Sequence, residues 1–319
     1  MCLTSASTPS LVDRLRSGDA RALARAISIV ENRRPEAVAL LKTLFPSTGH
    51  ARVLGLTGAP GAGKSTLVDQ IAKHYRKENQ TVGIIAVDPT SPYTGGAILG
   101  DRIRMQDHYS DPGIFIRSMA TRGSLGGLAR TTADVATVLD ASGRDLIMIE
   151  TVGVGQDEVD IVRLADVTIV ILVPGMGDDV QTIKAGIMEI ADIFVINKSD
   201  REGAERVERE IRSMQSLDIR KDGWTPPIVK TVASDGTGTK ELAAAIGNYE
   251  AYLKNENLLV QKNVENWRER LIEMLRDAML EKARARITDG ALDRYAVEIA
   301  EHKRDPYSLV EEIVSGTAK

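Results

Sequence analysis

The chain has 319 residues, which at roughly 150 residues per domain predicts about two domains. Its 41 Lys and Arg residues and 45 Asp and Glu residues give a net charge of −4. This balance argues against electrostatic binding to nucleic acid or anionic lipid. The single cysteine excludes an internal disulfide, and four scattered histidines argue against a histidine-based zinc site.

Residues 1–45 are predicted to form an N-terminal helical extension. Asp19 is placed to cap a helix in which Leu23 and Ile27 recur on one face. Pro35 then stands where the first turn of a further helix tolerates proline.

Residues 46–255 are predicted to form a central α/β domain, because short β-branched runs alternate there with segments of helical spacing. The runs are continuously apolar, as expected of strands buried on both faces of a sheet. They occupy residues 53–57, 81–87, 114–117, 146–150, 167–173, 193–196 and 227–232. We therefore expect a mostly parallel sheet flanked by helices, with helical extensions at both ends.

Residues 256–319 are predicted to form a C-terminal helical arm. One apolar stripe follows the i, i+3, i+4, i+7 rule, which predicts an amphipathic helix. Its members are Val264, Trp267, Leu271, Met274, Leu275 and Ala278. Alternating Arg and Glu residues around it indicate a solvated, salt-bridged face rather than a nucleic-acid surface. No apolar run approaches 18 residues and the first ten residues do not resemble a secretory signal, so we expect no membrane segment and a cytoplasmic location.

A phosphate-binding loop is the most specific feature of the sequence. The pattern G-x-x-x-x-G-K-[ST] follows the first predicted strand and opens a helix. Glycines allow backbone N–H groups to approach phosphate oxygens, and the helix N-terminus favours negative charge. Lys64 suits the β- and γ-phosphates, and the Ser65 hydroxyl suits Mg²⁺. The residues expected to line this site are Gly58, Ala59, Pro60, Gly61, Ala62, Gly63, Lys64, Ser65 and Thr66.

Three acidic residues are candidates for the magnesium side of a triphosphate site. Asp88 directly follows one predicted strand, Glu150 ends another, and Asp101 lies in a glycine-rich stretch. Ligands in open α/β sheets gather at the carboxyl ends of the strands. Lys64, Asp101 and Glu150 are therefore the catalytic candidates, and the backbone N–H of Gly153 is a candidate γ-phosphate sensor.

A guanine-reading pattern, N-K-x-D, follows the sixth predicted strand at Asn197, Lys198 and Asp200. A carboxylate such as Asp200 accepts two hydrogen bonds from guanine, whereas adenine offers no such donor pair and would leave a buried carboxylate unpaired. Ser234 follows the last predicted strand, where a backbone N–H can meet guanine O6. The pattern favours GTP over ATP.

A glutamine that orients the attacking water directly follows the corresponding glycine in Ras-like GTPases. In this chain Gly153 is followed by Val154 and Gly155 and only then by Gln156. We therefore expect slow intrinsic hydrolysis that a partner accelerates.

Taken together, these motifs resemble the MeaB/ArgK/MMAA family of P-loop GTPases, which have a SIMIBI-like fold. The resemblance extends over the central region and depends on two strings that are not general to GTPases. These are Glu-Thr-Val-Gly-Val-Gly-Gln at 150–156 and Pro-Gly-Met-Gly-Asp at 174–178.

The resemblance implies a chaperone for an adenosylcobalamin-dependent acyl-CoA mutase, usually methylmalonyl-CoA mutase. It also implies a homodimer that pairs through the C-terminal helices, which the apolar stripe from Val264 to Ala278 fits, although packing of the stripe within one chain fits equally. Binding and hydrolysis of GTP would gate delivery of the cofactor and protect the mutase from inactivation. It supports the roles given above to Lys64 and Ser65, to the three acidic residues and to the base-reading residues. It also implies that residues 175–184 form a switch coupled to the mutase, although their charges equally suit a solvated loop.

Two other enzyme classes stay open on the sequence. One is a P-loop kinase linked to amino-acid transport, which would need a base beside its acceptor hydroxyl. The other is a nickel-insertion GTPase, which would carry Cys and His ligands near the nucleotide. A nucleotide-dependent binding module with negligible turnover is the third alternative.

Overall fold

The computed structural model describes residues 10–88, 111–120, 127–151, 164–175, 190–216, 220, 222–288 and 290–316. The chain divides into two compact units, with the boundary in the sequence between Asn263 and Val264.

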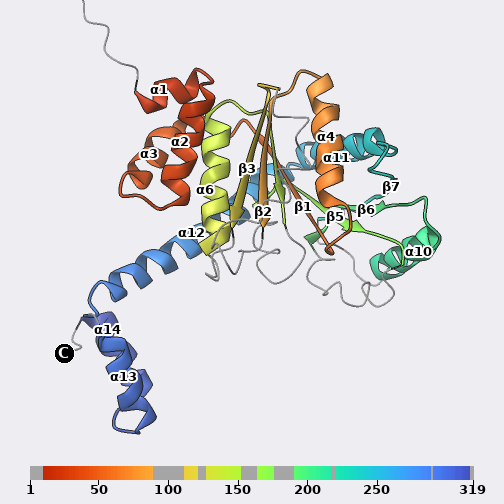
Figure 1. Ribbon diagram of the computed structural model, residues 1–319. Coiled ribbons are helices and arrows are strands. Elements are labelled where there is room, and N and C mark those ends of the chain that lie inside the picture. Colours follow the sequence, from red (N-terminus) through yellow and green to blue (C-terminus); the bar gives the residue numbers. More distant parts are fainter. Residues whose placement is uncertain are drawn as a thin grey trace, which may run out of the picture. The chain divides into compact units, whose positions relative to one another are not determined.

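Seven strands of the described residues form one sheet in the first unit, in the order β3-β2-β4-β1-β5-β6-β7 (Figure 1). Every neighbouring pair is parallel. Each of the seven predicted runs overlaps one strand, so the predicted α/β fold with a parallel sheet is confirmed. The strands are β1 (Arg52–Gly58), β2 (Val82–Asp88), β3 (Ile114–Ala120), β4 (Leu146–Glu150), β5 (Val167–Leu172), β6 (Ile193–Asn197) and β7 (Ile228–Thr231).

The central strands are apolar at successive positions because both faces of the sheet are covered. In β4, Leu146 and Met148 belong to one core and Ile147 and Ile149 to another, and all four are 0% exposed. Since successive side chains of a strand point to opposite faces, a strand with two covered faces tolerates no polar alternation.

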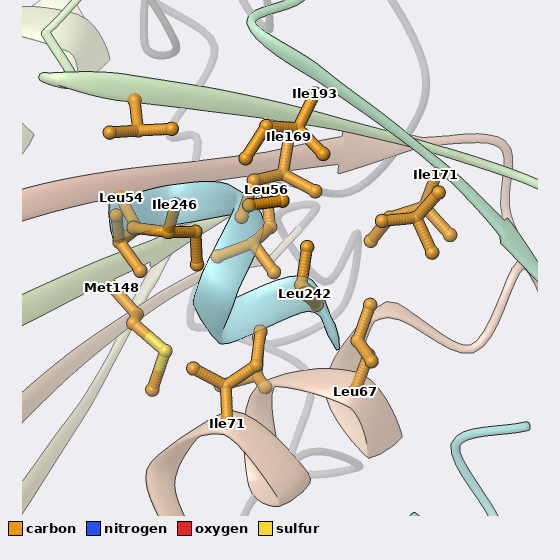
Figure 2. Packing of buried hydrophobic residues seen from close by; sticks show 14 of the residues in the cluster. Leu54, Leu56, Leu67, Ile71, Met148, Ile169, Ile171, Ile193, Leu242 and Ile246 are labelled. Atoms are coloured by element: carbon orange, nitrogen blue, oxygen red, sulfur yellow. The ribbon is translucent and has the colours of Figure 1, made fainter. Parts of the chain in front are cut away.

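One face of the sheet is covered by α4 (Lys64–Lys77) and α11 (Thr239–Asn255). Figure 2 shows Leu67 and Ile71 of α4 and Leu242 and Ile246 of α11 against the strand residues of this core. The helical periodicity of these two pairs, i and i+4, places both members of each pair on the side that meets the sheet.

The opposite face is covered by helices that precede the strands in the sequence and by helices that lie between strands. These are α1 (Leu11–Arg16), α2 (Ala20–Glu31), α3 (Ala37–Leu44) and α6 (Gly127–Ala141), while α10 (Ala204–Gln215) covers β5 and β6. A short 3₁₀ turn, η1 (Phe45–Ser47), follows α3. The predicted cap is confirmed, because the Asp19 carboxylate accepts the backbone N–H groups of Arg21 and Ala22.

Three helices make up the C-terminal part of the chain: α12 (Leu258–Arg284), α13 (Ala291–Ala300) and α14 (Pro306–Ser315). α12 begins in the first unit and continues into the second. Within the second unit, Ala291 and Tyr295 of α13 pack against Leu309 of α14. No residue of α12 is buried. Within the described ranges, no helix has the length and apolar character needed to cross a membrane.

Candidate functional site

The carboxyl ends of the parallel strands bring four predicted segments to one edge of the sheet. β1 ends at Gly58, β4 at Glu150, β6 at Asn197 and β7 at Thr231, and β1 pairs directly with β4 as β6 does with β7. This is the edge at which open α/β sheets bind ligands.

The loop 58–63 has a backbone that only glycine accommodates at its two ends. Gly58 has φ +149°, and a Cβ there would lie 2.2 Å from the carbonyl oxygen of Ile171 in β5. Gly63 has φ +86°, and a Cβ there would lie 2.5 Å from Asn197 Nδ2. Gly63 is the N-cap of α4 and makes no side-chain hydrogen bond to the first backbone N–H groups of the helix. The loop and helix N-terminus together form a cradle suited to an anion.

Lys64 lies in the first turn of α4 and folds back over the loop. Its Nζ donates to the carbonyl oxygen of Gly58 at 2.7 Å and to that of Ala59 at 3.1 Å. The residue is 6% exposed, and a buried ammonium needs such oxygen partners. The contacts hold the positive charge of Lys64 against the start of the loop.

Ser65 connects α4 to the end of β4. Its hydroxyl donates to Glu150 Oε1 at 2.6 Å, and both residues are buried. Because the proton of the hydroxyl points to the carboxylate, the lone pairs of Ser65 Oγ are directed elsewhere. A hydroxyl oxygen next to a carboxylate is the hard-oxygen donor set that Mg²⁺ prefers, so these residues fit the ion expected from the sequence.

Asn197 ties three segments together. Its Nδ2 donates to the carbonyl oxygen of Ala62 at 2.8 Å. Its Oδ1 accepts the Thr231 hydroxyl and the backbone N–H of Ala233, both at 3.1 Å. The residue is 2% exposed, so β6 holds the phosphate cradle and the segment after β7 through one buried amide.

Lys198 and Asp200 follow the buried Asn197 in the sequence and are more exposed to solvent than it is. Lys198 has φ +55°, and its Nζ donates to the carbonyl oxygen of Gly61 at 2.6 Å. Left-handed backbone is uncommon outside glycine and is often found at functional sites. Asp200 and Ser234 are exposed, as is Thr66 in the first turn of α4.

Some predicted site residues cannot be placed. Asp101, Gly153, Gln156 and most of the segment 175–184 lie outside the described residues. Asp88 is the last residue of β2, which places its backbone at the same sheet edge. The described cradle therefore contains Lys64, Ser65 and Glu150 of the predicted catalytic and metal-binding set.

Thr231 was not singled out in the sequence, yet it is 0% exposed and its hydroxyl supports Asn197. The signal available for it was weak: a hydroxyl-bearing residue at the end of an apolar strand is common in any protein. What makes it a site residue is a contact across 34 positions, which no local pattern contains.

The chain matches known proteins over most of its length. The sequence profile of the family described as Methylmalonyl Co-A mutase-associated GTPase MeaB matches residues 23–288. A candidate GTPase of Pyrococcus abyssi is 50% identical over 315 residues, covering 96% of this chain and 97% of that protein. The GTPase ArgK of Escherichia coli is 37% identical over 267 residues, covering 81% of each chain.

Two further matches come from a mammalian protein and a crystal structure. The mitochondrial methylmalonic aciduria type A homolog of Mus musculus is 36% identical over 253 residues, covering 72% of this chain and 61% of that protein. A crystal structure described as a LAO/AO transport system kinase superposes with a TM-score of 0.71 at 27% identity, covering 97% of this chain and 99% of that one.

Proposed function

The chain belongs to the MeaB family of methylmalonyl-CoA mutase-associated GTPases, and on that premise we propose that it is a GTP-hydrolysing chaperone of an adenosylcobalamin-dependent acyl-CoA mutase. Methylmalonyl-CoA mutase is the proposed client. Through its cycle of GTP and GDP binding, the protein would gate cofactor delivery to the mutase and protect it from inactivation.

The observation that carries the nucleotide-binding part is the buried amide of Asn197, which joins the phosphate cradle to the segment after β7. A nucleotide is a phosphate chain joined to a base, so its site needs these two loops at a fixed separation. Lys198 strengthens the connection through the carbonyl of Gly61. Asp200, exposed on the same side, is proposed to accept the two N–H donors of guanine, and the backbone N–H of Ser234 is proposed to meet guanine O6.

Hydrolysis would depend on charge placed around the phosphates. Lys64 holds an ammonium against the start of the loop, and Ser65 with Glu150 would hold Mg²⁺, together with Asp88 and Asp101. The ion would neutralise charge that develops on the phosphate oxygens. Glu150 keeps the Ser65 hydroxyl oriented, because its Oε1 accepts a hydrogen bond from that hydroxyl. Asp101 and Glu150 are proposed to orient the attacking water.

Slow hydrolysis in the absence of a partner is also part of the proposal. The glutamine of the segment after β4 is three positions beyond Gly153 rather than adjacent to it. The mutase would then complete the site and raise the rate. This links nucleotide turnover to the presence of the client.

Homodimer formation through α12 is proposed from its exposed apolar stripe. Val264 is 51% exposed, Leu271 52% and Leu275 62%, at spacings that place them along one side of the helix. Exposed apolar side chains in such a row are typical of a helix that pairs with another surface. A second copy of the same helix offers a matching stripe.

Phosphate release from GTP, measured with and without purified methylmalonyl-CoA mutase, tests the proposal. We expect slow release by the protein alone and faster release when the mutase is added, with no phosphate transferred to a third molecule. A Lys64→Ala variant with the same mutase controls for contaminating activity. Labelled phosphate on an acceptor would instead identify a kinase, and a rate unchanged by the mutase would refute the chaperone role.

A further inference from the structure

A part-buried set of contacts around Lys262, here called the Lys262 socket, joins the first turns of α12 to the amino edge of the sheet. Lys262 Nζ donates to the carbonyl oxygen of Asp166 at 2.7 Å, to Asp192 Oδ2 at 3.0 Å and to Tyr249 Oη at 3.0 Å. An ammonium has three N–H donors, and all three are placed on oxygen here. The Tyr249 ring lies 4.8 Å from the same ammonium, so it contacts both the face and the hydroxyl of the tyrosine.

Asp192 makes most of the contacts that hold this socket together. Its side chain is 3% exposed and also accepts the backbone N–H of Thr168 at 2.9 Å and Arg220 Nη2 at 3.1 Å. The indole N–H of Trp224 donates to the Asp192 carbonyl oxygen at 2.9 Å. A buried carboxylate depends on its hydrogen-bonded and charged partners, and Lys262 is one of the two cations, with Arg220, that contact Asp192.

The socket and the nucleotide cradle lie at opposite ends of one strand. Asp192 directly precedes β6, and Asn197 ends it. The strand is five residues long, or about 16 Å at about 3.3 Å per residue. The four residues between, 193–196, are at most 1% exposed. Close-packed interiors have little free volume and transmit strain, so a shift at one end of β6 is expected to move the other.

We propose that β6 couples the first turns of α12 to the nucleotide site, with Lys262 as the positioning residue at one end and Asn197 as the contact at the other. The inference rests on the proposed guanine-nucleotide binding and adds a regulatory connection to it. α12 also carries the exposed apolar stripe. A molecule that binds α12 would then change the affinity for nucleotide, and bound nucleotide would change the affinity of α12 for that molecule by the same factor.

Lys262→Met tests the coupling, because methionine keeps a long apolar side chain over the Tyr249 ring and removes the charge. Arg220 stays beside Asp192, so the carboxylate keeps one cation. Two quantities are measured on the full chain: the dissociation constants for GDP and a non-hydrolysable GTP analogue with Mg²⁺, and amide hydrogen exchange over residues 258–266. Lys254→Met, an exposed lysine in the last turn of α11, is the matched control.

In the wild type we expect nucleotide binding to slow exchange over residues 258–266. In Lys262→Met we expect this response to disappear and nucleotide affinity to fall about fivefold or more, the lower end of typical coupling between sites. Lys254→Met should behave as wild type. Tyr249→Phe, which removes one of the three oxygens and keeps the ring, should give a smaller change and serves if Lys262→Met does not fold.

A merely structural role would give a different result. If Lys262→Met lowers the urea midpoint but binds both nucleotides as tightly as wild type, with the exchange response intact, the coupling is wrong while the proposed function stands. If the wild type itself binds no guanine nucleotide, the proposed function and the coupling both fail.

Discussion

Replacing Asn197 by alanine removes a buried side chain that joins the phosphate cradle to the segment after β7. Three hydrogen bonds disappear, at 2.8, 3.1 and 3.1 Å, and the partners left behind include the carbonyl of Ala62 and the N–H of Ala233. At about 1 kcal/mol for each buried hydrogen bond, the free energy of unfolding of the nucleotide-free protein should fall by about 3 kcal/mol. Nucleotide affinity should also fall, because the two loops are no longer held at one separation.

Thr231→Val is the matched control, since it keeps the shape of the side chain and removes only one of the three hydrogen bonds. It should lower the free energy of unfolding by about 1 kcal/mol. Urea unfolding followed by tryptophan fluorescence measures both variants. The chain has two tryptophans, so a Trp267→Phe background leaves Trp224, which packs near the sheet, as the reporter. Equal losses for Asn197→Ala and Thr231→Val would refute the bracing role of the amide.

Three further outcomes are expected. Lys64→Ala should abolish tight GTP binding in calorimetry. Lys73→Ala, farther along the same helix and in a part-buried ion pair with Asp69, should bind normally; equal affinities would contradict the placement of the cradle. Asp200→Asn should weaken GTP by about 1–3 kcal/mol and leave ATP little changed, and an equal loss for both nucleotides would contradict base reading. The backbone N–H and the hydroxyl of Thr81 donate to Asp145 and hold the pKa of its carboxyl below the usual 3.8. This carboxylate therefore stabilises the fold above pH 3.8 and loses that effect as the pH falls through its lower folded pKa. Asp145→Asn should reduce the decrease of the urea midpoint at acid pH. An unchanged decrease would contradict the assignment.

The strands and the phosphate loop were predictable because their signals are local. A strand covered on both faces must be apolar at successive positions, and β4 satisfies this with Leu146, Ile147, Met148 and Ile149. The loop needs glycine where a Cβ would meet backbone or side-chain atoms, and the spacing of such glycines is visible in the sequence.

The connections between these parts were not predictable. Asn197 was expected to read the base, and the structure adds a bracing role that depends on Ala62, 135 positions away. The Lys262 socket brings together residues up to 96 positions apart. Lys262 is one of 11 charged residues among the 27 of α12, and nothing in its local sequence indicates these contacts. Such contacts follow from the order of strands in the sheet, which the sequence pattern alone leaves open.

Calorimetric titration of the freshly purified full chain with a non-hydrolysable GTP analogue, in the presence of Mg²⁺, tests the central claim most directly. We predict saturable binding of one analogue per chain that an equal concentration of the matching ATP analogue does not reproduce. No measurable heat with the GTP analogue, or equal affinity for both analogues, would contradict the account.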